Sequence, residues 1–106
     1  MGLIDFFRAP DINAGVAEYY ETANAVLLDV RTRQEYGEGH IFGSKNIPLQ
    51  EIGQAGRMIP KKDTPIFVHC LSGARSRQAV NQLGQMGYTN VKNIGGISSY
   101  RGKVER

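Results

Sequence analysis

The sequence predicts one α/β domain built around a mainly parallel sheet. Short segments that are almost entirely apolar alternate with segments whose apolar residues recur at helical spacing. Glycine, proline and small polar residues separate these segments. Strands joined in this way run parallel and are connected by right-handed crossovers. Ligands of such sheets bind beyond the carboxyl ends of the strands.

The first part of the chain predicts a helix, a buried strand and a second helix. Asp11 can cap a helix whose apolar residues are Ile12, Val16, Tyr19 and Tyr20. Residues 26–30 are nearly all apolar, with Asp29 as the exception, and predict a strand buried on both faces. Thr32 and Glu35 then have the spacing of a capping box, so a short helix is expected to begin directly after this strand.

The middle of the chain predicts a short helix between two turns. Glycines break the chain before residues 46–48. A helix that ends near Gly56 is then indicated by Leu49, Ile52 and Ala55. The polar residues 60–65 predict a turn before the next strand.

The last part of the chain repeats the pattern of strand and helix. Residues 66–70 predict a buried strand, and a helix from about Arg75 to Gly87 has an apolar face of Ala79, Val80, Leu83 and Met86. Residues 91–94 predict a short last strand, which ends at Gly95 and Gly96. A final helical turn around Tyr100 is expected, capped by Ser98 or Ser99.

Length and composition predict a folded single domain over residues 1–106, because hydrophobic residues make up 41% of the chain and charged residues 22%. The 13 basic residues are scattered among 10 acidic ones, which argues against a nucleic-acid partner. Residues 1–8 lack the pattern of a leader sequence, and no apolar run approaches the length of about 20 residues that spans a membrane. We therefore expect a cytoplasmic protein without a membrane partner.

Cys70, the only cysteine, lies where an apolar strand meets a glycine-containing loop. The free N–H groups of the following helix and its positive dipole end stabilise an anion in such a loop, and a thiolate is an anion. Gly73 allows a tight turn between the small residues Ser72 and Ala74. Cys70 is therefore the candidate nucleophile; the alternative is an inert, buried cysteine.

The candidate binding loop comprises Leu71, Ser72, Gly73, Ala74, Arg75 and Ser76. Arg75 supplies a fixed positive charge, which can pair with an anionic substrate or support the thiolate. His69 precedes Cys70, but neighbouring side chains on a strand point to opposite faces, so a core role is expected for it. His40 follows no metal-site spacing, and we predict no metal site.

The loop resembles that of the rhodanese (sulfurtransferase) family, Cys-x-x-Gly-x-Arg-Ser, at Cys70, Gly73, Arg75 and Ser76. Further similar segments lie between residues 11 and 103, at 28–31, 35–36, 39–41, 46–48 and 95–96. The resemblance implies a rhodanese-like fold, with a mainly parallel central sheet of about five strands and helices on both faces.

By the same resemblance, the Cys70 thiolate would take the outer sulfur of a small anionic donor such as thiosulfate and hold it as a persulfide. Residues 71–76 would bind the donor, and the acceptor would be cyanide, a thiol or a protein. No metal or organic cofactor is implied. Leu71 stands where the family often has arginine, which places the use of thiosulfate itself in question.

Two other functions remain open from the sequence. One is a rhodanese-like regulatory or protein-binding module with little turnover. The other is a phosphatase or arsenate reductase on the same fold, which would require a longer loop, Cys-x5-Arg; only four residues separate Cys70 from Arg75. Asp29 and Arg31 could pair at the strand end or remain separate surface charges.

Overall fold

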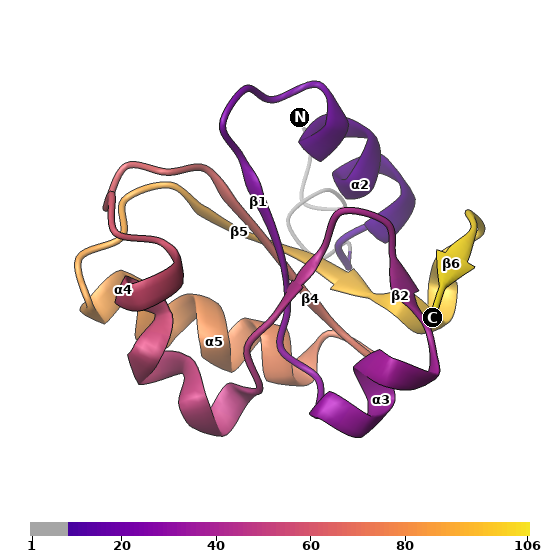
Figure 1. Ribbon diagram of the computed structural model, residues 1–106. Coiled ribbons are helices and arrows are strands. Elements are labelled where there is room, and N and C mark those ends of the chain that lie inside the picture. The colour runs from indigo at the N-terminus through magenta and orange to yellow at the C-terminus, as the bar shows by residue number, and fades with distance from the viewer. Residues whose placement is uncertain (1–8) are drawn as a thin grey trace.

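The computed structural model describes residues 9–106, and the expected absence of a leader sequence concerns residues 1–8, which lie outside the described residues. Four parallel strands form the central sheet in the order β3-β1-β4-β5 (Figure 1). Their bounds are Val26–Asp29 for β1, Lys45–Asn46 for β3, Ile66–Cys70 for β4 and Val91–Gly96 for β5. The predicted α/β class with a mainly parallel sheet is confirmed.

Strand β4 lies between β1 and β5, and all of its residues are buried. Its apolar sequence fits this place, because a central parallel strand is covered on both faces. The register sets Asp29 beside His69, and Cys70 beside Gly96. The carboxyl ends of β1, β4 and β5 therefore meet at one edge of the sheet, where Cys70 lies.

Helices cover both faces of the sheet, as the family resemblance implies (Figure 1). Helix α2 (Ile12–Tyr20) packs on one face, in a core with Phe67 and Ile94. The other face carries the 3-10 helix η1 (Leu49–Gln54), α4 (Ala55–Met58) and α5 (Ala74–Gln85). Within residues 9–106, no helix has the length and apolar character to cross a membrane.

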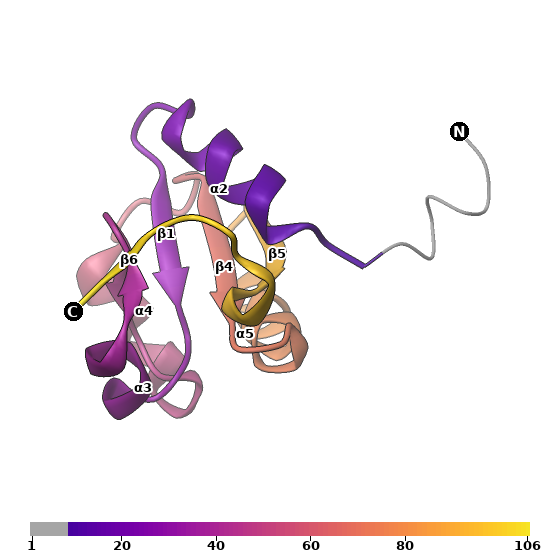
Figure 2. The same cartoon turned by 90° about the vertical axis from the view of Figure 1, so that its right-hand side faces the viewer.

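The central sheet has four strands, whereas about five were expected, and a second sheet of two strands lies apart from it. Strands β2 (His40–Ile41) and β6 (Val104–Glu105) pair antiparallel, apart from the four central strands. The chain after β5 crosses the molecule to reach β2 (Figure 2). Strands of two residues carry no periodic pattern, so the sequence did not indicate them.

Two helix starts agree with the predicted caps. The Asp11 side chain accepts from the N–H of Asn13 at the start of α2. Helix α3 (Arg33–Glu38) begins with the predicted capping box of Thr32 and Glu35. Both contacts are local in the chain, which explains why residue spacing alone predicted them.

Three predicted boundaries differ from the structure. Strand β5, expected over residues 91–94, continues to Gly96. The helical segment expected to end near Gly56 continues through α4 to Met58. The last helical turn, η2 (Ile97–Ser99), precedes Tyr100 instead of surrounding it, and no side chain caps it. Ser98 and Ser99 therefore lie within the turn, because strand β5 runs directly into it from Gly96.

Gly15 allows α2 to approach β5 closely. A Cβ at this position would overlap the Ile94 side chain, with Cγ2 only 2.5 Å away. Gly84 on α5 is a suitable control position, since a Cβ there would meet no atom within 4 Å. Both glycines lie inside helices, so the intrinsic helical preference for alanine is the same in each case.

We expect Gly15→Ala to destabilise the domain by about 1–3 kcal/mol, because overpacking displaces α2 from the sheet. Gly84→Ala should raise the free energy of unfolding, by up to about 1 kcal/mol. Urea unfolding followed by circular dichroism measures both. Equal effects of the two substitutions would show that α2 does not depend on this close approach.

Candidate active site

Cys70 ends β4 with its sulfur beneath the loop that leads into α5. The residue is 1% exposed. The N–H of Gly73 donates to the sulfur at 3.0 Å, and the hydroxyl oxygen of Ser76 lies 3.5 Å from it. Gly73 has a φ of +108°, a conformation that favours glycine, and this turn carries its N–H toward the sulfur.

The loop also controls the ionisation of Cys70. Burial raises the pKa of the thiol, but the Ser76 hydroxyl and the backbone N–H groups of Ser76, Gly73 and Ser72 lower it. The hydrogen bonds outweigh the burial, so the pKa lies below the ordinary value for cysteine. A larger fraction of Cys70 is therefore thiolate near neutral pH.

Arg75 is held by Glu35 from α3. Two hydrogen bonds of 2.7 and 3.0 Å join the guanidinium to the carboxylate. The Glu35 carboxylate also accepts from the N–H of Thr32 at 2.8 Å. Chiefly because of Arg75, the pKa of Glu35 falls to about 2, and the pair stays charged at neutral pH. The structure thus places Arg75 on a protein carboxylate, whereas the sequence had suggested a substrate or the thiolate as its partner.

The first residues of the loop rest on the end of β5. The N–H of Ser98 donates to the Leu71 carbonyl at 3.1 Å. A Cβ on Gly96 would overlap the Leu71 carbonyl oxygen and would lie 2.5 Å from the Cα of Ser72. A side chain at position 96 would therefore push the loop away from β5.

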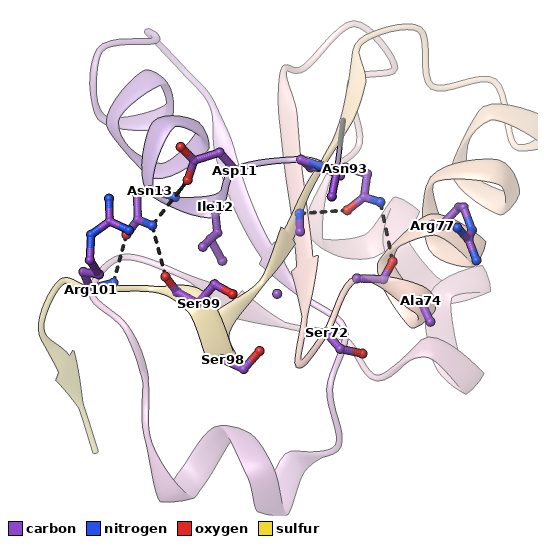
Figure 3. A pocket seen from close by; sticks show the side chains of 15 residues that line it. Asp11, Ile12, Asn13, Ser72, Ala74, Arg77, Asn93, Ser98, Ser99 and Arg101 are labelled. Carbon is purple, nitrogen blue, oxygen red and sulfur yellow. Dashed lines mark hydrogen bonds between the residues drawn. The ribbon is translucent and has the colours of Figure 1, made fainter. Parts of the chain in front are cut away.

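The side chain of Leu71 is 43% exposed beside Cys70. The outer side of the loop borders an open hollow of about 780 Å³, which lies between the start of α2 and the end of β5. Ser72, Gly73 and Ala74 line this hollow, but Cys70 does not. Its two arginines, Arg77 and Arg101, stand on opposite sides (Figure 3).

A buried ion pair closes the end of β1. The carboxylate of Asp29 accepts from the Nε of Arg31 at 3.0 Å and from its Nη2 at 2.8 Å. Both side chains are buried, which resolves the alternative of separate surface charges. Arg31 Nη2 also donates to the Gly39 carbonyl at 2.7 Å, so the pair fixes the chain on both sides of α3.

His69 lies in the core, as expected, and its side chain has no exposed surface. Its Nδ1 lies 3.2 Å from the Cys70 carbonyl oxygen, which accepts, so Nδ1 carries the proton. The Nε2 atom is 3.7 Å from an Asp29 oxygen and has no hydrogen-bond partner within the described chain. Residues 9–106 contain no group of three histidine, cysteine or acidic side chains that could hold a metal.

Comparison with known proteins agrees with the fold. The sequence model of the rhodanese-like domain family matches residues 14–103. This chain belongs to that family.

Curated relatives of this rhodanese-like domain include named sulfurtransferases. Thiosulfate sulfurtransferase PspE of Escherichia coli (strain K12) is 39% identical over 71 residues, which cover 66% of this chain and 68% of the relative. Thiosulfate sulfurtransferase 16, chloroplastic, of Arabidopsis thaliana is 37% identical, with 88% of each chain covered. A solved rhodanese with anions from E. coli superimposes with a TM-score of 0.72 at 34% identity, covering 77% of this chain and 98% of that one.

Two contributions to the site of this rhodanese-like domain were missed from the sequence. Glu35 was recognised as a capping residue but not as the partner of Arg75. Asn93 on β5, which contacts Ser76 through its side chain, was not singled out. Both contacts join distant parts of the chain, and only the alternation of strands and helices, which brings strand ends together, could have hinted at them.

We expect His69 to make the stability of the domain depend on pH. Burial lowers the pKa of His69 below its ordinary value, and Asp29 opposes this only in part. As the pH falls below about 6.5, the unfolded chain therefore binds a proton before the folded chain does, and folding stability decreases. Thermal unfolding between about pH 7.5 and about pH 5 measures this loss.

His69→Gln removes the titrating group and should flatten this part of the pH profile. The comparison is between the slopes of Tm against pH, so a lower absolute Tm of the variant does not affect it. Identical slopes for the variant and the unmodified domain would assign the pH dependence to other groups.

Proposed function

We propose that this domain is a sulfurtransferase that carries sulfur as a persulfide on Cys70. The proposal rests on the two polar groups beside the Cys70 sulfur, the Gly73 N–H at 3.0 Å and the Ser76 hydroxyl at 3.5 Å. These groups favour a negative charge on sulfur. The named sulfurtransferases among its relatives support the same reaction class.

In the first half-reaction, the Cys70 thiolate attacks the outer sulfur of a sulfane donor. With thiosulfate, a sulfur–sulfur bond forms to Cys70 while the bond to the inner sulfur breaks, and sulfite leaves with that electron pair. The product on the protein is a persulfide anion. The loop N–H groups and the amino end of α5 would stabilise this charge.

In the second half-reaction, a nucleophilic acceptor takes the outer sulfur and Cys70 leaves as a thiolate. Cyanide, a small thiol or a cysteine of a partner protein has the required nucleophilicity. The charge balance is the same in each case, because an anion attacks and an anion leaves. No metal or redox cofactor is required for either step.

The charges around the loop support a donor with less negative charge than thiosulfate. Leu71 brings an apolar side chain to the surface beside Cys70, and Glu35 neutralises most of the positive charge of Arg75. A persulfide of a small thiol or of a protein fits these features better than a dianion does. We propose residues 71–76 as the donor-binding loop.

The loop length supports sulfur transfer over phosphate or arsenate chemistry, because four residues between Cys70 and Arg75 make a smaller loop than Cys-x5-Arg. A protein-binding module with little turnover is the second candidate. The exposed Leu71 favours it, since an apolar side chain at the site is suited to contact with a partner protein.

Incubation with thiosulfate or a small-molecule persulfide should add one sulfur, about 32 Da, to the domain. Cys70→Ser should abolish this gain while the thermal unfolding temperature changes little, because the substitution removes only the nucleophile. Intact mass spectrometry measures the adduct, and the release of sulfite measures the first half-reaction. A persistent adduct on Cys70→Ser would exclude the mechanism, and no adduct with any donor would favour the binding module.

Leu71→Arg should raise kcat/KM for thiosulfate by about fivefold at low salt, since a charge–charge contact at a protein surface contributes on the order of 1 kcal/mol. The gain should shrink as ionic strength rises. Leu71→Gln is the matched control without charge. If a neutral persulfide donor gained as much as thiosulfate, the effect would come from loop shape and not from charge.

A further inference from the structure

Asn93 joins strand β5 to the loop around Cys70. Its Oδ1 accepts from the Ser76 hydroxyl at 2.8 Å and from the N–H of Gly95 at 3.0 Å. Its Nδ2 lies 3.5 Å from the Gly73 carbonyl oxygen. Figure 3 shows this side chain between β5 and the loop that carries Ser72 and Ala74.

The orientation of the Asn93 amide follows from its partners. The Gly95 N–H is only a donor, so the atom facing it must be the amide oxygen. The Gly73 carbonyl is only an acceptor, so the atom facing it must be the amide nitrogen. Asn93 therefore presents an acceptor, and not a donor, to Ser76.

The Ser76 hydroxyl has one proton and three neighbours that can receive it. The distances from its oxygen are 2.8 Å to Asn93 Oδ1, 3.0 Å to the Gly73 carbonyl and 3.5 Å to the Cys70 sulfur. Ser76 has no exposed surface, so its hydroxyl stays among these three groups. When the hydroxyl donates to the nearest of them, Asn93 Oδ1, its proton is not available to the sulfur.

The state of Cys70 decides where this proton is most needed. A thiol can donate to the Ser76 oxygen while Ser76 donates to Asn93. A thiolate is only an acceptor, so the hydroxyl must turn toward sulfur to stabilise it. After this rotation of the hydroxyl, Asn93 Oδ1 still accepts a hydrogen bond from the Gly95 N–H.

We infer that Asn93 is a positioning residue, which controls through Ser76 how much hydrogen bonding the Cys70 sulfur receives. The inference deepens the proposed function. It rests on that function only in assuming that a persulfide anion on Cys70 would be stabilised by the same groups as the thiolate. The hydrogen bonding of the thiolate itself can be measured without any sulfur transfer.

Other charged groups near Cys70 act from different directions. Arg75 on α5 is paired with Glu35 from α3. Asp29 at the end of β1 is paired with Arg31 and lies 3.7 Å from His69 on β4. On the side of β5, the residue beside Cys70 is Gly96, which carries no charge. The Gly73 N–H and the Ser76 hydroxyl lie 3.0 and 3.5 Å from the sulfur, and the backbone N–H groups of Ser72 and Ser76 also favour its charged form.

Asn93→Asp keeps an acceptor in place for Ser76 and Gly95 and makes it anionic, so it should hold the hydroxyl proton more strongly. We expect the thiolate fraction of Cys70 at a fixed pH to fall by about fivefold, the effect of one hydrogen bond of ordinary strength. Ultraviolet absorbance of the thiolate during a pH titration measures this fraction. Subtraction of the matching Cys70→Ser variant removes the signal of the tyrosines.

A Ser76→Ala background separates this route from a direct effect of the new charge. If Asn93 acts through Ser76, the fall caused by Asn93→Asp should shrink to less than about twofold in that background. An equal fall in both backgrounds would overturn the inference. Asn90→Asp, which adds the same charge just before β5, is the control and should leave the titration of Cys70 unchanged.

Asn93→Ala provides a second test without an added charge. It removes the acceptor at 2.8 Å, so the thiolate fraction should rise, and this rise should also disappear with Ser76→Ala. Thermal unfolding of each variant shows whether it is folded. An unchanged titration in folded Asn93→Ala and Asn93→Asp would overturn the inference. If Asn93 shifts the titration but the unmodified domain takes up no sulfur from any donor, the proposed function fails and the inference about Asn93 stands.

Discussion

The close contact between the loop after Cys70 and the backbone of β5 is the constraint on which the site depends. The Leu71 carbonyl and the Ser72 Cα approach Gly96 so closely that a side chain there would separate the two segments. The Ser98 N–H binds the Leu71 carbonyl at 3.1 Å and holds the loop down. With Leu71 and Ser72 held in this way, the turn at Gly73 places its N–H 3.0 Å from the sulfur. Gly96 at the end of β5 thus helps to set the surroundings of Cys70.

Neutral dipoles, and not a full positive charge, provide most of the stabilisation of a charged sulfur in this arrangement. The one arginine of the loop is joined by two hydrogen bonds to Glu35, so little of its charge is available. Backbone N–H groups and a hydroxyl are fixed in place before charge develops, and they cost no reorganisation when it does.

The sequence predicted the parts of this molecule that depend on local spacing. Strand β4, the capping box of Thr32 and Glu35, and the position of Cys70 at a strand end all follow from patterns within a few residues. Strands β2 and β6 were not predicted because two residues show no alternation. The contacts of Arg75 with Glu35 and of Ser76 with Asn93 join residues 40 and 17 positions apart. Only the packing of helices and strand ends brings them together.

The end of β1 shows how a buried charge acts on the loop from a distance. Asp29 and Arg31 lose hydration on burial, and such a pair contributes little net stability unless its hydrogen bonds are complete. Here further hydrogen bonds support the pair, since Arg31 also binds the Gly39 carbonyl and its own N–H donates to Asp29. The pair therefore fixes both ends of α3, between which lies Glu35. A fixed Glu35 holds Arg75 at the start of α5, so the geometry of the Cys70 loop is set from β1 on one side and from β5 on the other.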